Sequence, residues 1–387
     1  MHRHLDKTIK EHFDRYKQIL ILLGSRQTGK TTLVKKVFSD FDYLLVDNEP
    51  IRKILETYDI ESYKTLFDLK NKKIIIDEIH LLSDPGRCAK VIFDQLEGVK
   101  LVITGSSSFH IKNKTGESLA GRKIDYYLFP LTLSEYLQQT DIEKLLNFKI
   151  FENILKEKNV QDRMHKFDMD TILNNILVYG QYPYIINSPR DKKYLENFVD
   201  SLIFKDIIEL NLIEDKRLAK DLLRLLSLQI GNLISYSELA NSLKADQRTI
   251  KRYIEIFEQS FVLFRLYPYS KNKRDEISKS AKIYFYDTGV RNALINNFSD
   301  LDLRNDKGAL FENFIICELI KQNNYLNKDF KFYYWRTKQG SEIDLVLENK
   351  DILLGLELKY KQKSINKAFK SRYTNAQVKI ITSSNFY

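Results

Sequence analysis

Cysteine and long apolar stretches are what this sequence has least of. Only two of the 387 residues are cysteines, Cys88 and Cys317, which lie far apart and without the spacing of metal ligands. Their scarcity argues against a disulfide framework. No apolar run is long enough to span a membrane, and the start, Met1 to Asp6, lacks the apolar core of a signal peptide. We therefore expect a cytoplasmic protein without a membrane partner.

The length and the net charge of the chain limit the number of domains and the kind of partner that we expect. A chain of 387 residues suggests about two to four domains, and 43% hydrophobic residues are enough for packed cores. The net charge is +10 and the isoelectric point is near 9.1, which favours a polyanionic partner such as nucleic acid. Coding biased towards A and T also produces a chain rich in Lys, Ile, Asn and Tyr, so charge alone leaves both explanations open.

One stretch fits a phosphate-binding loop at every fixed position. The apolar residues 19–23 run into G-x-x-x-x-G-K-T, and residues 33–37 then have helical spacing. The two glycines let successive N–H groups turn inward around a phosphate, and the helix N-terminus adds partial positive charge. Lys30 is expected to reach the β- and γ-phosphates, and the Thr31 hydroxyl to bind Mg²⁺. The predicted nucleotide-binding residues are Gly24, Ser25, Arg26, Gln27, Thr28, Gly29, Lys30, Thr31 and Thr32.

A buried strand that ends in two acids completes the predicted hydrolytic site. Residues 43–47 read as a second strand, and residues 73–80 contain a third that ends in Asp77 and Glu78. Asp77 would hold Mg²⁺ through water, and Glu78 would orient and deprotonate the attacking water. Together with the upstream loop, these acids predict hydrolysis of ATP.

Two further residues are candidates for contact with the transferred phosphate. A fourth strand, residues 100–104, ends in a serine cluster from which Ser106 could contact the γ-phosphate and the lytic water. Arg122 lies just before a fifth strand, residues 124–129. There a cation can neutralise transition-state charge in its own subunit or in a neighbouring one, which leaves a homo-oligomer open.

The ordered set of motifs resembles prokaryotic ATPases of the AAA superfamily, which carry a carboxyl-terminal domain of uncharacterised function. The resemblance covers nearly the whole chain, and it implies an AAA-type α/β core with Glu78 catalytic, Ser106 near the first sensor position and Arg122 as a finger. The family usually has two glycines before an aromatic–proline pair, and Gln181 replaces the second one here. The motifs are Gly24 to Thr32, Ile74 to Glu78, Thr104 to Ser107, Leu119 to Arg122 and Tyr179 to Pro183.

The middle of the chain predicts a helical lid and then a winged helix-turn-helix. Residues 138–205 look amphipathic and helical, and a lid over the nucleotide is the natural assignment. Ser235 has capping-box spacing for one short helix, and Asp246 can cap a second. Residues 261–266 follow as a strand, and the basic residues 271–274 could form the wing.

The second of these short helices begins with polar and basic residues. This is the end that would face a DNA major groove in a helix-turn-helix. A helical protein-interaction module with a solvated charged face is the alternative. The predicted DNA-binding residues are Arg248, Lys251 and Arg252.

The last segment predicts a second site. If a hairpin turns at residues 350–351, Asp344 faces Glu357 and Lys359 projects from the same face, while Glu312 on a nearby amphipathic helix can join them. This is the layout of the PD-(D/E)xK nucleases, in which two carboxylates bind Mg²⁺ and the lysine orients water. A cross-strand ionic cluster on a small sheet is the alternative.

The sequence as a whole predicts an α/β protein with an AAA-type P-loop core, a helical lid, a winged helix and a small α+β nuclease-like domain. The expected cofactors are ATP and Mg²⁺, and the expected partner is double-stranded DNA. A signalling switch with protein partners and an ATP-gated DNA endonuclease are the rival functions. The predicted domains are residues 1–137, 138–205, 206–275 and 276–387.

Overall fold

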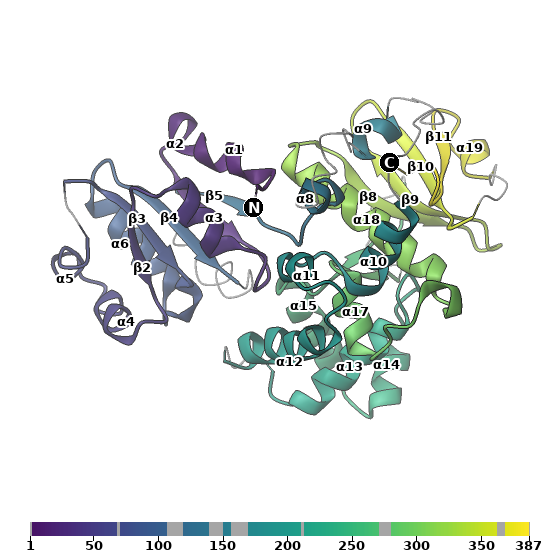
Figure 1. Ribbon diagram of the computed structural model, residues 1–387, viewed down its shortest axis with the longest axis horizontal. Coiled ribbons are helices and arrows are strands. Elements are labelled where there is room, and N and C mark those ends of the chain that lie inside the picture. The colour runs from purple at the N-terminus through teal and green to yellow at the C-terminus, as the bar shows by residue number, and fades with distance from the viewer. Residues whose placement is uncertain are drawn as a thin grey trace. The chain divides into compact units, whose positions relative to one another are not determined.

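The structure is a computed structural model that divides into two compact units (Figure 1). The first unit holds residues 1–130 with 202–214 and 259–261, and the second holds the rest. Among the described helices, none is both long and apolar enough to cross a lipid bilayer. The described residues are 2–67, 70–106, 119–138, 150–155, 169–209 (backbone only from 202), 213–270, 280–361 and 368–386.

The first unit is built on a five-stranded parallel sheet with the strand order β2-β3-β4-β1-β5. Every residue of β1, which lies between β4 and β5, is fully buried, as expected where a parallel sheet is covered on both faces. Each of the five predicted strands is present, with ends that differ by one to a few residues. The strands are β1 (Ile19–Leu23), β2 (Asp42–Leu45), β3 (Lys73–Asp77), β4 (Lys100–Gly105) and β5 (Lys123–Tyr127).

Short helices connect these strands, and the two longest begin in ways that the sequence explains. The helix after β1 starts at Lys30 with Gly29 as its N-cap, and the helix before β4 starts at Pro85, where the Asp84 side chain accepts a hydrogen bond from the Arg87 N–H. The helices are α1 (Leu5–Lys10), α2 (His12–Arg15), α3 (Lys30–Val37), α4 (Glu49–Leu55), α5 (Ile60–Tyr63), η1 (Ile79–Leu81) and α6 (Pro85–Gln95).

The second unit begins with helices in the range for which the sequence predicted a lid. Thr288 and Asn292 of α17 bond to carbonyls at the end of α10, so this part of the range packs against the carboxyl-terminal half of the chain. Residues 139–149 and 156–168 lie outside the described residues, and the role of a lid stays a prediction. The helices are α8 (Leu133–Gln138), α9 (Ile150–Leu155), α10 (Met169–Tyr179), α11 (Pro183–Asn187), α12 (Lys192–Glu209) and α17 (Thr288–Leu294).

Two helices and a hairpin follow where the sequence predicted a winged helix-turn-helix. The helices α14 (Tyr236–Leu243) and α15 (Gln247–Gln259) come after α13 (Lys216–Leu228), and β6 (Leu263–Leu266) pairs antiparallel with β7 (Lys282–Phe285). The predicted caps are present: Ser235 accepts from the Glu238 N–H at 3.3 Å, and Asp246 from the Arg248 N–H at 2.7 Å. The predicted wing, residues 271–274, lies outside the described residues.

A four-stranded sheet in the order β11-β10-β9-β8 closes the chain. The predicted hairpin register is present, since Leu354 pairs with Leu347 and Leu356 with Leu345, and each pair of numbers sums to 701. The elements are η3 (Leu301–Leu303), α18 (Lys307–Tyr325), β8 (Lys331–Arg336), β9 (Glu342–Glu348), β10 (Leu353–Leu358), α19 (Ala368–Arg372) and β11 (Gln377–Ile381).

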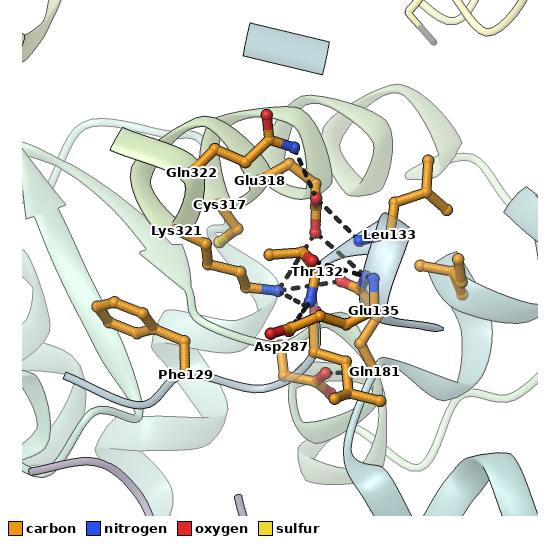
Figure 2. A network of polar contacts seen from close by, with 12 residues as sticks. Phe129, Thr132, Leu133, Glu135, Gln181, Asp287, Cys317, Glu318, Lys321 and Gln322 are labelled. Carbon is orange, nitrogen blue, oxygen red and sulfur yellow. Dashed lines mark hydrogen bonds and ion pairs between the residues drawn. The ribbon is translucent and has the colours of Figure 1, made fainter. Parts of the chain in front are cut away.

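A buried polar network holds the elements of the second unit together (Figure 2). Lys321 of α18 donates to the Leu131 carbonyl at 2.9 Å and to the Gln181 side chain at 3.1 Å. Glu318 accepts from the Leu133 N–H at 3.0 Å and from Gln181 at 3.1 Å. Lys321 and Glu318 are both fully buried. Gln181, which replaces a glycine of the family pattern, is therefore part of this network, hereafter the Lys321–Glu318 network.

Candidate functional site

The phosphate loop connects the fully buried β1 to α3. A Cβ on Gly24 would lie 2.1 Å from the Leu128 carbonyl oxygen, so only glycine fits where the loop leaves the strand. Gly29 has φ 95°, a left-handed conformation that glycine adopts without strain. The Lys30 ammonium donates to the carbonyls of Gly24 and Ser25, each at 2.9 Å. These contacts hold the lysine side chain over the loop, where its charge is available to phosphate oxygens.

Asp77, at the carboxyl end of β3, is surrounded by hydroxyl groups. Its Oδ2 accepts from Thr31 at 2.7 Å and from Tyr43 at 2.5 Å, and its Oδ1 accepts from Thr104. The carboxyl is 1% exposed. Burial, and then the Asp77 carboxylate, raises the pKa of the Tyr43 hydroxyl well above its usual range, so Tyr43 remains a donor. The three hydrogen-bond partners described for this carboxylate are all oxygen atoms, and carboxylate and hydroxyl oxygens suit a hard divalent cation such as Mg²⁺.

Glu78 is held in a left-handed backbone conformation, with φ 59° and ψ 39°. Such a conformation is uncommon for a residue with a Cβ and costs roughly 1–3 kcal/mol. Its N–H donates to the Thr104 hydroxyl at 3.2 Å, which ties the turn after β3 to the end of β4. Its carboxylate lies 3.2 Å from Nδ1 of His80. The turn thus places the Glu78 carboxylate beside the His80 ring.

One cavity of about 610 Å³ is lined by six of the nine predicted nucleotide-binding residues, Arg26, Gln27, Gly29, Lys30, Thr31 and Thr32. Lys30 and Thr31 of the loop line it, and so do Asp77 and Glu78 from the end of β3. Tyr43, the second residue of β2, also lines it. Neighbouring parallel strands end at the same edge of a sheet, so their terminal side chains meet where a ligand can bind. The cavity therefore contains both a phosphate-binding loop and a carboxylate that can act as a base.

Ser106 and Arg122 take different positions from these residues. Ser106 is buried, its hydroxyl lies 3.0 Å from Nε2 of His80, and it is not among the described residues that line the cavity. Arg122 makes a bidentate contact with Asp94 at 2.8 and 3.2 Å. Its carbonyl accepts from the N–H of Ile19 at the start of β1, so one strand, roughly 16 Å, separates it from the loop. Within one chain its guanidinium lies at the other end of the sheet.

Four residues contribute to this site without a signal strong enough for the sequence to single them out. Tyr43, Thr104 and His80 contact the two acids, as described above. Arg3, 4% exposed, donates to the carbonyls of Thr28 and Phe129, each at 2.7 Å. These two bonds connect the phosphate loop to the segment after β5. The contacts of Tyr43 and Thr104 depend on which strands are neighbours in the sheet, and Arg3 lies far from the loop in the chain, so none of the three has a local sequence signal.

The predicted second site lies on β9, β10 and α18, and lysines occupy it. Asp344 accepts from Lys359 at 2.8 Å and from the Leu358 N–H at 2.8 Å. Glu312 accepts from the Tyr284 hydroxyl at 2.5 Å and lies 3.5 Å from Lys282, which also pairs with Glu342. Burial raises the pKa of Glu312 to about 7, although Lys282 opposes the shift.

These acids do not form a cluster of three metal ligands. Among the described residues, no group of three His, Cys, Asp or Glu side chains is placed to hold a metal ion. Glu357, on β10, is 5% exposed. Lys282, from β7, is a buried lysine at this site that the sequence did not indicate. Metal binding by Glu312, Asp344, Glu357 and Lys359 stays a prediction.

The predicted DNA-binding residues lie on the first two turns of α15. Arg248, Lys251 and Arg252 are all exposed, and the Lys251 ammonium lies 5.2 Å from the centre of the Tyr236 ring on α14. The opposite side of α15 is buried through Ile250, Tyr253, Ile254, Ile256 and Phe257.

Comparisons with known proteins agree with this geometry for the first unit. Residues 16–137 match a family described as an AAA domain. Residues 170–301 and 307–383 match two families described as domains of unknown function (DUF8612 and DUF4143).

Among relatives, an uncharacterised protein of Methanocaldococcus jannaschii is 28% identical over 94% of this chain and 82% of its own length. A second protein from that organism is 27% identical over 74% of this chain and 65% of its own length. A solved Walker-type ATPase of Pyrococcus abyssi is 14% identical, with a TM-score of 0.49 over 75% of this chain and 94% of its own. The AAA domain match and the cavity together support a P-loop, AAA-type ATPase domain in the first unit.

Proposed function

We propose that this chain is a Mg²⁺-dependent ATPase. The observation that carries the proposal is the cavity in which Lys30, Thr31, Asp77 and Glu78 meet. Lys30 brings positive charge to the β- and γ-phosphates, and the backbone N–H groups of the loop bind the phosphate oxygens. A bound Mg²⁺ would neutralise charge on the phosphates, and Thr31 and Asp77 would hold it. Glu78 accepts a proton from the attacking water.

Two substitutions separate binding from turnover. Lys30→Ala is expected to abolish ATP binding, because it removes the point charge on the phosphates. Glu78→Gln is expected to retain ATP and to lose turnover by about 10²–10⁴-fold, the usual contribution of a positioned general base. Steady-state phosphate release and equilibrium binding of a fluorescent ATP analogue measure the two effects. An equal loss of ATP affinity in both variants would contradict the role given to Glu78.

Arg122 is proposed to act on the cavity of a neighbouring subunit, because it lies at the other end of β1 from its own phosphate loop. Arg122→Ala and Lys30→Ala should then both be inactive alone and should recover turnover when mixed, since a mixed oligomer contains intact sites. A mixture that stays inactive although the two variants assemble would contradict action in trans.

We further propose that nucleotide turnover is coupled to double-stranded DNA through α15. Support comes from its three exposed cations near the amino end and from the net charge of +10. Replacing Arg248, Lys251 and Arg252 together by Ala should weaken DNA binding and flatten its salt dependence. Each phosphate contact contributes about 0.9 log unit of affinity per log unit of salt. An unchanged slope, or oligomerisation driven by nucleotide with no effect of DNA on turnover, would favour a protein-binding switch.

The carboxyl-terminal region is proposed as a nuclease-like domain. Support comes from the register that places Asp344 on β9 beside β10, which carries Glu357, and from the Lys359 contact with Asp344. Mn²⁺-dependent nicking of DNA that is lost in Asp344→Ala would show that the domain cleaves. Absence of divalent-ion binding at millimolar concentration in the Lys30→Ala protein would make it a nuclease-like domain without cleavage.

A further inference from the structure

His80 connects the catalytic acid of the proposed ATPase to Ser106. Its imidazole is 1% exposed and lies on η1, the single turn that follows Glu78. Nδ1 lies 3.2 Å from Oε2 of Glu78, and Nε2 lies 3.0 Å from the Ser106 hydroxyl. The three side chains therefore form a line from the end of β4 to the end of β3, and of the three only Glu78 is among the cavity-lining residues.

The contact between His80 Nδ1 and Glu78 Oε2 is an ion-pair distance without hydrogen-bond geometry, whereas Nε2 and the Ser106 hydroxyl are hydrogen-bonded. The positions of the imidazole protons follow from the chemistry of these groups. An ionised carboxylate only accepts hydrogen bonds, so Nδ1 has to carry the proton that faces Glu78. In a neutral imidazole Nε2 is then an acceptor, and the Ser106 hydroxyl donates to it. Ser106 thereby fixes the tautomer of His80, and this tautomer turns the Nδ1 proton towards one oxygen of Glu78.

We infer that His80 is a positioning residue for Glu78 and that Ser106 acts on the reaction through His80 rather than by touching the γ-phosphate. This inference rests on the proposed ATPase activity. It gives a reason for the left-handed backbone of Glu78, because the turn at φ 59° sends the Glu78 side chain and the His80 ring towards one another. A carboxylate that is held at one oxygen loses little freedom when it engages the attacking water.

Two substitutions of His80 are matched in polarity but differ in which nitrogen they replace. The Asn side-chain amide occupies the position of Nδ1, so His80→Asn keeps a donor for Glu78 and loses the contact with Ser106. The Gln amide reaches the position of Nε2, so His80→Gln keeps the contact with Ser106 and loses the donor for Glu78. We expect His80→Gln to lower kcat by about 10–100-fold, the usual loss when a supporting residue is removed.

His80→Asn is expected to keep kcat within a few-fold of the parent chain, and in both variants the KM for Mg²⁺-ATP should stay nearly unchanged. In a Glu78→Gln background His80→Gln should have no further effect, because the two residues act as one unit. His12→Gln is the control. His12 is also fully buried in the first unit, and its two nitrogens contact Tyr126 and the Gln18 carbonyl instead.

The experiment is steady-state ATP turnover by the full-length chain and these variants, with thermal melting of each. If the parent chain shows no turnover that Lys30→Ala removes, the proposed ATPase function fails, and the inference fails with it. If the parent turns over and His80→Gln retains its kcat, the inference alone is overturned. It is equally overturned if His80→Asn and His80→Gln lose the same activity, or if the losses only follow melting temperature as in His12→Gln.

Discussion

Asp77 and Asp344 are both buried carboxylates on strands, at 1% and 6% exposure, yet their surroundings differ. Asp77 accepts from three hydroxyl groups and faces a cavity. Asp344 accepts from the Lys359 ammonium and a backbone N–H. Hydroxyl groups solvate a negative charge but do not neutralise it, whereas a lysine does both. A carboxylate with only hydroxyl partners therefore needs a cation from outside the protein, and one with a lysine does not.

The Lys321–Glu318 network shows the other extreme. The lysine and the glutamate lie 3.5 Å apart, and the other bonds are made by the side chains of Gln181 and Gln322 and by the backbone at residues 131 and 133. Protein groups supply its donors and acceptors, so its natural role is to fix the segment after residue 130 against α18. Buried acids and lysines thus suit catalysis where a ligand has to supply the missing partner, and structure where protein groups supply every partner.

The largest expected effect comes from exchanging the two aspartates for asparagine. Asp77→Asn should lower Mg²⁺-ATP turnover by about 10²–10³-fold, because charge stabilisation by a metal contributes several kcal/mol to a phosphoryl-transfer transition state. Asp344→Asn should leave ATP turnover intact. Phosphate release as a function of Mg²⁺ concentration measures both. Similar losses in the two variants would remove the distinction drawn between hydroxyl-lined and lysine-paired carboxylates.

How far the sequence predicts this site depends on how local the signal is. The phosphate loop, Asp77 and Glu78 are found from short motifs, because about ten residues are enough to identify a strand that ends at a glycine-rich turn or at paired acids. The hairpin register of β9 and β10 is also local, since the position of the turn fixes every pair. These parts could be predicted with the correct partners.

The remaining residues depend on which strands become neighbours. Tyr43 and Thr104 reach Asp77 only because β2 and β4 flank β3 in the sheet, and nothing in either segment indicates this order. Lys282 precedes the acids it contacts by at least 30 residues, and as a lone lysine in a chain with 62 Lys and Arg it carries no signal. Ser106 and His80 are 26 residues apart in the chain and meet only because β3 and β4 are neighbours, so the sequence predicts a role for the serine without indicating its histidine partner.

The next effect in size concerns the stability of the Lys321–Glu318 network. Lys321→Met removes a buried charge and leaves Glu318 uncompensated, which should destabilise the second unit by about 3–5 kcal/mol. Lys220→Met is the matched control, since Lys220 and its partner Asp200 are 59% and 62% exposed and such pairs contribute roughly 0–1 kcal/mol. Urea unfolding measures the difference. Equal losses of unfolding free energy in Lys321→Met and Lys220→Met would show that the buried network contributes no more than an exposed ion pair.

The smallest effect tests what compensates Glu312, the acid whose pKa burial raises to about 7. Lys282, Lys359, Tyr284 and Asp344 are its charged and titratable neighbours. The folded state keeps a proton on this carboxyl that the unfolded chain has lost above its ordinary pKa of 4.5, so stability should fall as pH rises from about 4.5 to 7 and then level off. Glu312→Gln cannot titrate and should remove this fall, which is on the order of 1–3 kcal/mol.

Unfolding free energies at pH 5 and pH 8 for the parent chain, for Glu312→Gln and for Asp302→Asn measure this fall. Asp302 is an exposed acid whose pKa is lowered by Lys307, so it is ionised in both states across this range and its removal should leave the slope unchanged. If a divalent ion rather than a proton compensates Glu312, millimolar Mn²⁺ will stabilise the parent at pH 8 and not Glu312→Gln. That result would make the carboxyl-terminal acids a metal site like the one proposed at Asp77, and would break the comparison.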